Sequence, residues 1–360
     1  MSQKVAFVSF RFGATDGVSV VARTWMDAFA AMGAEVVTVS GGPTEATPYP
    51  NRAVVGLGLD DDLPADGIEP ALRDSLDDVD LTVVENVLTI PMNLAASRAT
   101  LAVLAGRPAL VHHHDPPWHR RRFAHITELP ATDPSWRHVA ITQLLADELA
   151  ERGIDASVIH NAFPEPPHRS PAERAAVRSA VRTAVGLPRT DLVVAHPVRA
   201  IERKDLPAAI TLAEQLGATY WLLGPAEEGY GNELDRLLDR ATCPVVHHPW
   251  ADTEGIYLAA DHITFPSTWE GFGNPPLEAS LHRRTVSVGN YPVAEELRSF
   301  GFDWFSPTDV DGIRSALENH DDPPQVARAD RNQRIARESF SIEHMTAGLA
   351  EVLDEAGWSP

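Results

Sequence analysis

The chain has 360 residues, enough for two α/β domains of ordinary size. Its formal net charge of −21 opposes binding to nucleic acid or anionic lipid, because proteins hold both polyanions largely with Lys and Arg. The single cysteine, Cys243, excludes an intrachain disulfide and a zinc site of paired cysteines, and no apolar run is long enough to cross a bilayer. We therefore expect a cytoplasmic protein without membrane insertion.

Short β-branched runs alternate with helical patterns along the whole chain, which is typical of a parallel sheet with crossover helices. In the first half the clearest helix covers residues 18–32, where apolar residues recur with a period of 3.6 and Gly33 ends the pattern. The acidic stretches at residues 60–62 and 74–80 are expected to be solvated surface. The strands expected in this half are residues 5–10, 35–40, 81–85, 109–113, 138–141 and 157–159.

A proline-rich segment at residues 163–171, FPEPPHRSP, interrupts this alternation, and we place the domain linker there because proline lacks the N–H that helices and strands need. A helix at residues 172–185 follows. Further strands are expected at residues 192–196, 220–223, 245–247, 262–265 and 285–288. The sequence thus predicts two Rossmann-like, doubly wound domains, residues 1–165 and 166–340, and a C-terminal helix in residues 341–360 that packs back on the first domain.

The most specific motif, FPSTWEGFGNPPLEAS, begins at the end of the strand expected at residues 262–265. Ligands of open parallel sheets bind at the carboxyl ends of the strands, and a helix N-terminus there offers N–H donors to anions. The motif therefore predicts that backbone groups hold a diphosphate while Glu270 accepts hydrogen bonds from sugar hydroxyls and Glu278 reaches a ribose. In the alternative, Glu270 and Glu278 are a helix-start carboxylate and a surface residue. The donor-binding residues expected in the motif are Gly271, Phe272, Gly273, Asn274 and Glu278.

The setting PS-x-x-EGFG-x-x-x-LEA, with seven residues between the two glutamates, resembles the E-x7-E signature of glycosyltransferase family 4, whose members are retaining enzymes with the GT-B fold. A second segment, PVRAIERKDL, places Arg199 and Lys204 five residues apart, as in the G-R-x-x-x-x-K segment with which that family holds the donor diphosphate. Val198 stands where the family has glycine. The resemblance implies two Rossmann-like domains that face a cleft, the first for the acceptor and the second for a nucleotide sugar. Without it, Arg199 and Lys204 would be surface residues at a helix start.

Two more segments resemble that family. In HHPWADTEG, Trp250 would border the nucleobase, although a core aromatic fits the pattern equally well. In FRFGATDGVSVVA the glycines resemble the loop that family members close over the donor phosphates, so Gly17 is expected at the donor and Asp16 at the acceptor. By itself this segment is as well explained by a tight strand-to-helix turn, and it lacks the G-x-G-x-x-G spacing of a dinucleotide site.

The segment ALVHHHDPPWHRRRF places three histidines at a strand end. Adjacent side chains of a strand point to opposite faces, so the three cannot converge on one metal ion, and we expect no metal. In the family a histidine ending this strand contacts the donor sugar, and His114 is the best match, with His113 as the alternative. The arginines at residues 120–122 would bind an anionic acceptor, or they form a solvated helix face. The acceptor-binding residues expected are Asp16, His113, Asp115, Arg120 and Arg121. The family's second histidine position falls on Glu85 or Asn86.

The resemblance implies a catalytic set of Glu270, Arg199, Lys204 and His114. The two cations would offset charge on the leaving diphosphate, whose own oxygen would help to deprotonate the acceptor as it attacks the same sugar face. No protein nucleophile, cofactor or metal is then required. The expected donor is a nucleotide hexose of the UDP-glucose or GDP-mannose type, and the arginines favour a small acidic acceptor. A nucleotide-sugar epimerase, a sugar phosphorylase and a non-catalytic sugar-nucleotide-binding protein remain as alternatives.

Overall fold

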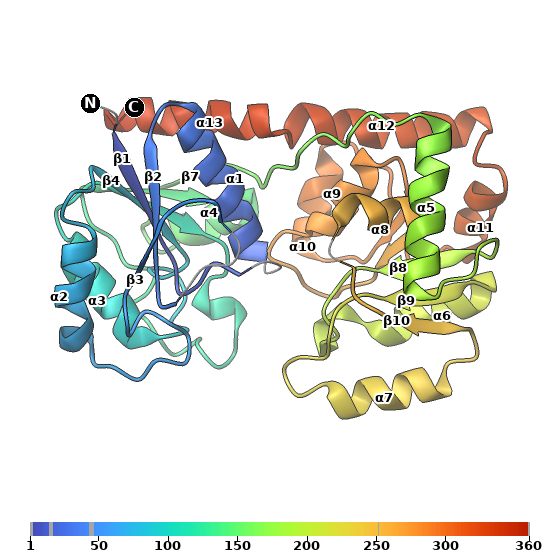
Figure 1. Ribbon diagram of the computed structural model, residues 1–360, viewed down its shortest axis with the longest axis horizontal. Helices are drawn as coiled ribbons and strands as arrows, with labels where there is room; N and C mark the ends of the chain where they lie inside the picture. Colours follow the sequence, from blue (N-terminus) through green and yellow to red (C-terminus); the bar gives the residue numbers. More distant parts are fainter. Residues whose placement is uncertain (1–2, 14–16, 43–46, 251, 359–360) are drawn as a thin grey trace. The chain divides into compact units, whose positions relative to one another are not determined.

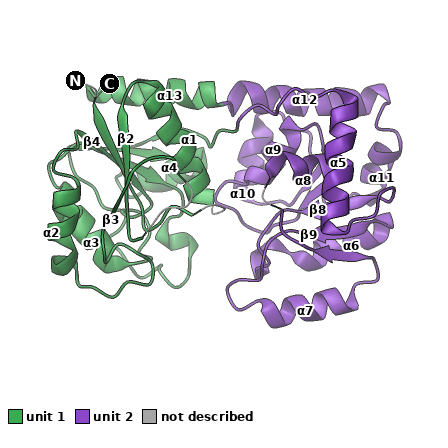
Figure 2. Cartoon of the chain, in the orientation of Figure 1, with its two compact units in different colours: residues 1–163, 342–360 green, residues 164–341 purple. Residues whose placement is uncertain are grey.

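The computed structural model describes residues 3–13, 17–42, 47–250 and 252–358, and the chain divides into two compact units (Figure 2). The first unit consists of residues 1–163 and 342–360, and the second of residues 164–341. Each unit is an α/β domain with one parallel sheet, as the sequence predicts (Figure 1). Within the described ranges, no helix combines the length and the apolar character needed to span a membrane.

The first unit contains a seven-stranded parallel sheet. In spatial order its strands are β3 (Asn51–Ala53), β2 (Glu35–Ser40), β1 (Lys4–Val8), β4 (Leu81–Glu85), β5 (Ala109–His113), β6 (Trp136–Ala140) and β7 (Ala156–Val158). Its helices are α1 (Gly17–Ala31), α2 (Ala65–Ser75), α3 (Leu94–Leu104), α4 (Gln143–Ala150) and α13 (Ile342–Ala356), with a 3-10 turn, η1 (Pro117–His119). The strand order reverses between β1 and β4, which makes the sheet doubly wound.

Both faces of this sheet are covered by helices. Along β1, Val5 and Phe7 join a core that includes side chains of α1 and α13, while Ala6 and Val8 join a core with side chains of α2 and α3. Successive strand residues point to opposite faces, so a strand buried on both sides reads as a continuous apolar run. This is why the central strands were predictable from the sequence.

Acidic residues between β2 and β4 form specific contacts within the first unit. Asp61 accepts hydrogen bonds from the N–H groups of Gly56 and Gly58. Asp78 forms ion pairs with Lys4 and Arg52. The strand β3 is not among the predicted elements, because three partly exposed residues at a sheet edge carry no apolar pattern.

The second unit contains a five-stranded parallel sheet. Its strands, in spatial order, are β10 (Val245–His247), β9 (Thr219–Leu222), β8 (Val193–His196), β11 (His262–Phe265) and β12 (Thr285–Val288). Its helices are α5 (Pro171–Val185), α6 (Leu206–Leu216), α7 (Gly231–Arg240), α8 (Thr253–Ala259), α9 (Asn274–Leu281), α10 (Pro292–Ser299), α11 (Val310–Glu318) and α12 (Pro323–Ser339), with a 3-10 turn, η2 (Glu202–Lys204). The strand order reverses between β8 and β11.

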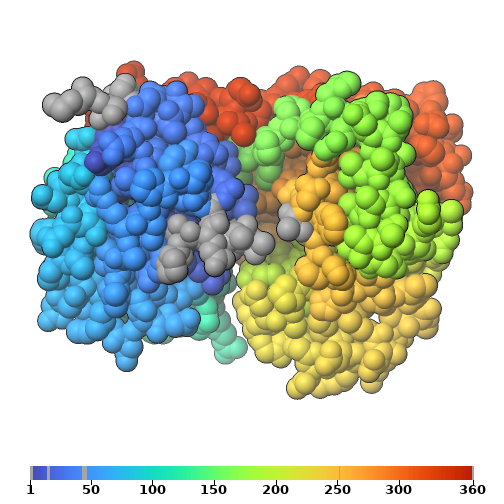
Figure 3. Space-filling view, in the orientation of Figure 1, coloured from blue at the N-terminus to red at the C-terminus, as the bar shows by residue number. Residues whose placement is uncertain are grey.

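The helix α5 opens the second sheet domain and lies on the face seen in Figure 3, where it is green. It begins with a capping box, in which the side chains of Ser170 and Glu173 satisfy each other's backbone N–H groups, and it ends at Gly186 in the left-handed conformation. Two arginines hold this helix in place, since the buried Arg182 and the partly exposed Arg178 both pair with Asp261, the residue before β11. These contacts hold the amino end of β11, and the loop that carries Glu270 follows the carboxyl end of the strand.

The C-terminal helix α13 belongs to the first unit, where Met345, Leu349 and Leu353 are buried in the core beside α1. We expect Leu349→Ala to lower the free energy of unfolding by about 2–5 kcal/mol, because it leaves a cavity in this core. Thermal denaturation of the full chain would measure the change. Glu351→Ala, on the exposed side of the same helix, is the control and should leave the melting temperature unchanged. Equal melting temperatures for both variants would contradict the packing of α13.

Candidate functional site

The predicted site residues follow the strands at which each sheet reverses its order. A doubly wound sheet offers its binding crevice at this switch point, outside the carboxyl ends of the strands. In the second unit Lys204 follows β8 and Glu270 follows β11, the two strands that flank the switch. In the first unit Glu85 ends β4, which flanks the switch, and His114 comes directly after the neighbouring β5.

The centre of the site in the second unit is a cluster of two cations around one buried carboxylate. Glu270 Oε1 accepts a hydrogen bond from Lys204 Nζ at 2.5 Å, and its Oε2 accepts one from Arg203 Nη1 at 2.6 Å. Arg203 also donates to the carbonyl oxygen of Trp269, and its own carbonyl accepts from the N–H of Thr268. The loops after β8 and β11 are therefore joined through Arg203 and Lys204, and one positive charge of the cluster is not neutralised by Glu270.

Burial weakens the basicity of Lys204. Loss of solvent is the largest effect on its ammonium group and lowers the pKa, and the charges of Arg203 and Arg199 lower it further. The charge of Glu270 opposes these effects, and the resulting pKa is about 8. The ammonium lies 5.0 Å from the ring centroid of Phe265, the last residue of β11. A lysine in this environment is a cation at neutral pH but loses its charge in mildly alkaline solution.

Arg199 lies in an exposed position, and its Nη1 donates to Glu227 at 2.6 Å. Its charge still reaches Lys204, whose pKa it helps to lower. Val198, which stands where the family has glycine, does not have a positive φ, and a close backbone approach in this turn is made by Gly224. A Cβ atom on Gly224 would lie 2.3 Å from the carbonyl oxygen of Val198. Gly224 is therefore the residue of this turn that cannot carry a side chain.

The Glu270 loop enters α9 through Gly273, which has φ +107° and whose Cβ would lie 2.9 Å from the hydroxyl of Tyr291. Only glycine fits both restrictions. The helix then begins Asn274-Pro275-Pro276, so two of the four donors expected from a helix start are absent. Backbone binding of an anion here depends more on the loop at residues 271–274 than on the helix end itself.

Glu278 lies on α9 and is partly buried, and its Oε2 accepts a hydrogen bond from Tyr257 at 2.6 Å. Burial raises the pKa of this carboxyl, while the Tyr257 hydroxyl opposes the shift. Tyr257 lies on α8 and stacks on His282. The tyrosine therefore fixes the orientation of Glu278, a role that sequence reasoning missed because the two residues are on different helices.

Four buried side-chain atoms near the carboxyl ends of this sheet have no hydrogen-bond partner among the described residues. They are His196 Nε2, Trp250 Nε1, Ser267 Oγ and Tyr291 Oη, which follow or end β8, β10, β11 and β12. A buried polar atom without a partner costs free energy, so such atoms need an explanation. Their placement along one sheet edge is what a polar ligand site in this unit would produce.

In the first unit a buried carboxylate again meets basic side chains. Glu85 Oε2 lies 2.7 Å from His114 Nε2 and 3.0 Å from His112 Nδ1, and the ligand atoms of the three residues lie within 4.8 Å of one another. His113 bonds to Thr89 and His138 and not to Glu85, so the three consecutive histidines do not meet at one point. His112 and His114 nevertheless meet Glu85 of the neighbouring strand, a convergence that was not predicted from the sequence.

His113 is placed in the core. Its Nδ1 bonds to the hydroxyl of Thr89 at 2.8 Å and its Nε2 to His138 Nδ1 at 2.9 Å, and the ring is fully buried. Loss of solvent lowers the pKa of His113 well below its usual value. Both ring nitrogens are used, so we no longer assign His113 to the acceptor.

The expected acceptor residues are only partly brought together. Asp115 pairs with Arg120, whereas Arg121 is exposed and Arg122 packs over the ring of Phe123. Arg120 lies in a bend and Arg121 and Arg122 lie in a turn, so the arginines do not form a helix face, although Arg121 and Arg122 are exposed.

The expected glycine-rich loop is described only at its two ends. Asp16 lies outside the described residues. The N–H of Gly13 donates to Ser19 Oγ at 2.8 Å. Gly17 begins α1 with no described atom within 4 Å of a Cβ built there, so packing within the described chain does not require glycine at this position.

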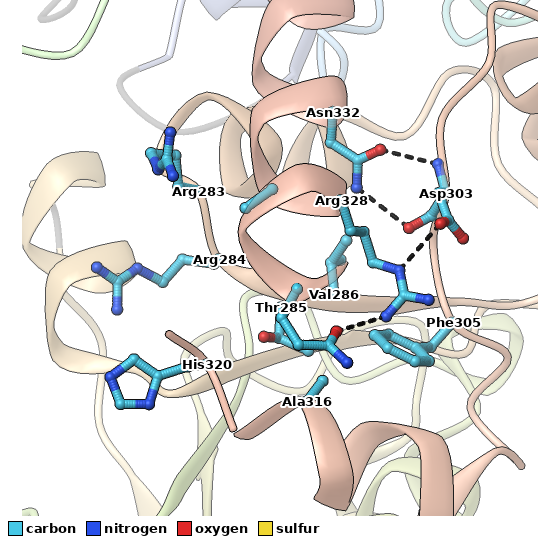
Figure 4. Close-up of a pocket in the computed structure, with 12 residues that line it drawn as sticks. Arg283, Arg284, Thr285, Val286, Asp303, Phe305, Ala316, His320, Arg328 and Asn332 are labelled. Atoms are coloured by element: carbon cyan, nitrogen blue, oxygen red, sulfur yellow. Dashed lines mark hydrogen bonds and ion pairs between the residues drawn. The ribbon is translucent and has the colours of Figure 1, made fainter. Parts of the chain in front are cut away.

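A separate pocket of about 70 Å³ lies at the opposite edge of the second sheet, beside the first residues of β12 (Figure 4). It is lined by side chains from the start of β12 and from α11 and α12. Two of its arginines have partners, because Arg328 pairs with Asp303 and Arg283 pairs with Asp330, whereas the buried Nε of Arg284 has no hydrogen-bond partner among the described residues. We place the candidate site at the carboxyl edge and not in this pocket, because the motifs that follow β8 and β11 lie at the carboxyl edge.

Comparisons with known proteins give the fold and the class of activity. The chain matches no family model. It is 26% identical to the mannosylglucosylglycerate synthase of Thermotoga maritima over 81% of each chain, and 25% identical to that of Petrotoga mobilis over 83% of this chain and 85% of the relative.

Solved structures resemble the whole chain. HepE of Anabaena in complex with UDP-glucose has a TM-score of 0.74 and 18% identity over 98% of this chain and 99% of its own. WaaG, a glycosyltransferase of lipopolysaccharide biosynthesis, has a TM-score of 0.65 and 14% identity over 97% and 99%. The fold is that of GT-B glycosyltransferases, and together with the relatives it supports hexosyltransferase activity.

The lowered pKa of Lys204 can be measured directly, because the sequence contains only two lysines, Lys4 and Lys204. In protein labelled with ¹³Cε-lysine, NMR titration should show the Lys204 signal shifting with a midpoint near pH 8. Lys4 is the internal control, since its hydrogen bonds to Asp78 and Glu35 raise its pKa above the usual 10.5. Glu270→Gln removes the stabilising anion and should lower the Lys204 midpoint further. A Lys204 midpoint above pH 10 would contradict the burial of this group.

Proposed function

We propose that the chain is a retaining, metal-independent glycosyltransferase of family 4, which transfers a hexose from a nucleoside diphosphate sugar to a small acidic acceptor. The observation that carries the proposal is the cluster of Lys204 and Arg203 around Glu270 at the switch point of the second sheet. A group transfer from a diphosphate needs cations where negative charge develops, and preorganised charges in a site that excludes water act most strongly. The E-x7-E spacing supports the assignment to family 4.

Each predicted site residue of the second unit has a role in this proposal. Lys204 and Arg199 stabilise the leaving diphosphate, and Glu270 accepts hydrogen bonds from sugar hydroxyls. Glu278, oriented by Tyr257, binds the ribose diol, and Trp250 borders the nucleobase with an indole N–H that lacks a partner within the described chain. The loop at residues 271–274 supplies backbone donors. We add Arg203, which holds the second oxygen of Glu270 and keeps that carboxylate in place when Lys204 turns to the diphosphate.

The proposed reaction proceeds on one face of the sugar. The bond between the anomeric carbon and the diphosphate oxygen breaks, and the acceptor hydroxyl forms the new bond on the same face. The hydroxyl proton passes to the departing diphosphate oxygen, so no protein nucleophile and no metal ion are needed. His114 contacts the sugar from the first unit in this proposal, and we place the reaction in the cytoplasm.

The relatives narrow the proposed substrates. The name of the two mannosylglucosylglycerate synthases describes a product that contains mannose, glucose and glycerate. A carboxylate-bearing acceptor of the glucosylglycerate type, with a hexose donor of the UDP-glucose or GDP-mannose type, agrees with that name. We propose Arg120 and Arg121 as the groups that attract the acceptor carboxylate.

Glu270→Ala and Lys204→Ala should each lower turnover about a hundredfold or more, as expected when a preorganised electrostatic contact is lost. Transfer of hexose to glucosylglycerate from a matched nucleotide sugar would be followed by product chromatography. Arg236→Ala is the control, because it breaks an exposed ion pair with Glu233 of similar length on α7. Near-wild-type turnover of a folded Glu270 or Lys204 variant would remove that residue from the mechanism.

Binding of the donor can be tested without an acceptor. In EDTA, one nucleotide sugar from a panel of UDP-, GDP-, ADP- and TDP-sugars should raise the melting temperature, since a ligand at one hundred times its dissociation constant adds about 2.7 kcal/mol. Stabilisation that requires Mg²⁺ or Mn²⁺ would contradict metal independence. Conversion of the donor to its epimer without acceptor would show an epimerase instead.

A further inference from the structure

The buried carboxylate of Glu85 has no role in the reaction described above, although two histidine rings of the first unit hold it. Glu85 ends β4, and in the register of the sheet it lies opposite His112 of β5. Its side chain is fully buried and bonds to the rings of both His112 and His114. Burying a carboxylate away from water is costly unless such partners are present, so the arrangement needs a reason.

The charge of Glu85 determines where the histidine protons lie. Burial raises the pKa of the Glu85 carboxyl, but the imidazoles of His112 and His114 outweigh this effect and lower it to about 2. The group is therefore an ionised carboxylate at neutral pH and can only accept hydrogen bonds. The nitrogens that face it, Nε2 of His114 and Nδ1 of His112, must carry hydrogen. His114 is then left with Nδ1 as a hydrogen-bond acceptor whenever the ring is neutral.

The next residue, Asn86, holds the main chain of His114. Its Oδ1 accepts from the backbone N–H of His114 at 3.0 Å and from that of Asp115 at 3.2 Å. Asn86 has φ +63°, a left-handed conformation that asparagine tolerates better than most residues. Two consecutive residues at the end of β4 thus fix both the ring and the backbone of His114. Such backbone conformations persist where many surrounding contacts enforce them, and they are common at functional sites.

His112 supports the carboxylate from the interior of the unit, where its Nε2 has no hydrogen-bond partner among the described residues. Its ring stacks on Trp25 of α1 with centroids 3.9 Å apart, and its side chain is fully buried. Loss of solvent lowers the pKa of His112, and the charge of Glu85 opposes this effect. In contrast, His114 keeps 5% of its surface exposed at the end of the strand. Of the two rings that meet Glu85, only that of His114 has access to a ligand.

We propose that Glu85 is a positioning residue that holds His114 as the Nε2-protonated tautomer, so that Nδ1 accepts a hydrogen bond from a hydroxyl group of the sugar substrate. The inference rests on the proposed function, because it assumes that His114 contacts a sugar. Among the described residues Nδ1 of His114 has no hydrogen-bond partner of its own. Sugars offer many O–H donors, and a neutral ring with a fixed lone pair selects such a donor over an anionic oxygen.

A double-mutant cycle tests whether Glu85 acts through His114. Glu85→Gln keeps the shape and removes the charge, and it should lower kcat/KM about ten- to a hundredfold, as expected for the loss of a hydrogen bond to a charged group. His114→Asn should cost at least as much, and the double variant should be no worse than His114→Asn alone. Fully additive losses would overturn the proposal. Glu148→Gln is the matched control, since it removes the carboxylate partner of His119 from a partly exposed pair and should leave kcat/KM unchanged.

The tautomer itself can be observed without turnover. In protein with ¹⁵N-labelled histidine, two-bond correlation spectra should show His114 with the proton on Nε2, the assignment resting on the signals absent from His114→Asn. Glu85→Gln should shift the population toward the Nδ1-protonated form, and a wild-type ring already in that form would overturn the proposal. The tautomer of His114 can be measured even if no sugar transfer is found. A failure of the proposed function can therefore be told apart from a failure of Glu85 to hold the ring of His114.

Metal analysis of the same sample decides whether the three side chains hold a cation instead. The protein should bind no Zn²⁺ or Mn²⁺ at stoichiometric level, and EDTA should leave the His112 and His114 spectra unchanged. One tightly bound ion per chain whose removal shifts both rings would assign Glu85, His112 and His114 to a metal and overturn the positioning role. If Glu85→Gln fails to fold, the wild-type spectra and the metal analysis still decide between the outcomes.

Discussion

The ammonium group of Lys204 and the carboxylate of Glu270 are buried together, and the geometry of the second unit depends on this pair. A charge of either kind would be costly to bury alone, and removing one partner leaves the other unpaired in a dry environment. The pair joins the loop after β8 to the loop after β11 across 66 positions of sequence. Arg203 takes the second oxygen of Glu270, so the carboxylate is held from two sides and its orientation is fixed before any ligand arrives.

Each unit buries a glutamate near the switch point of its sheet, but the basic side chains that hold the carboxylate differ between the units. Each has a doubly wound sheet, and in each a buried glutamate lies at or after the carboxyl end of a strand that flanks the switch point, Glu85 in the first and Glu270 in the second. In the second unit the partners are a lysine and an arginine, which bring excess positive charge. In the first the partners are His112 and His114, which bring protons whose position the carboxylate controls. The former suits an anionic leaving group and the latter suits neutral hydroxyls.

Most of the sheet architecture was predictable from the sequence, because strands buried on both faces read as apolar runs with clear ends. The short edge strand β3 has no such pattern. The central pair Glu270 and Lys204 could be named because both follow strands in recognisable motifs. Arg203 was missed, since the 3-10 turn η2 that brings it to Glu270 beside Lys204 leaves no periodic signal. The histidines at β5 were harder, because which ring faces a ligand depends on the register with Glu85 on β4.

The close contact between Gly224 and the carbonyl of Val198 bears on how such chains are recognised. Gly224 must lack a side chain because the backbone of the loop after β8 passes against it, whereas Val198 fits the facing position without a positive φ. A search pattern that insists on glycine directly before the arginine would pass over this chain. A larger residue at position 224 would push on the loop that carries Arg199, so a distant position in the sequence constrains the backbone of the cationic motif.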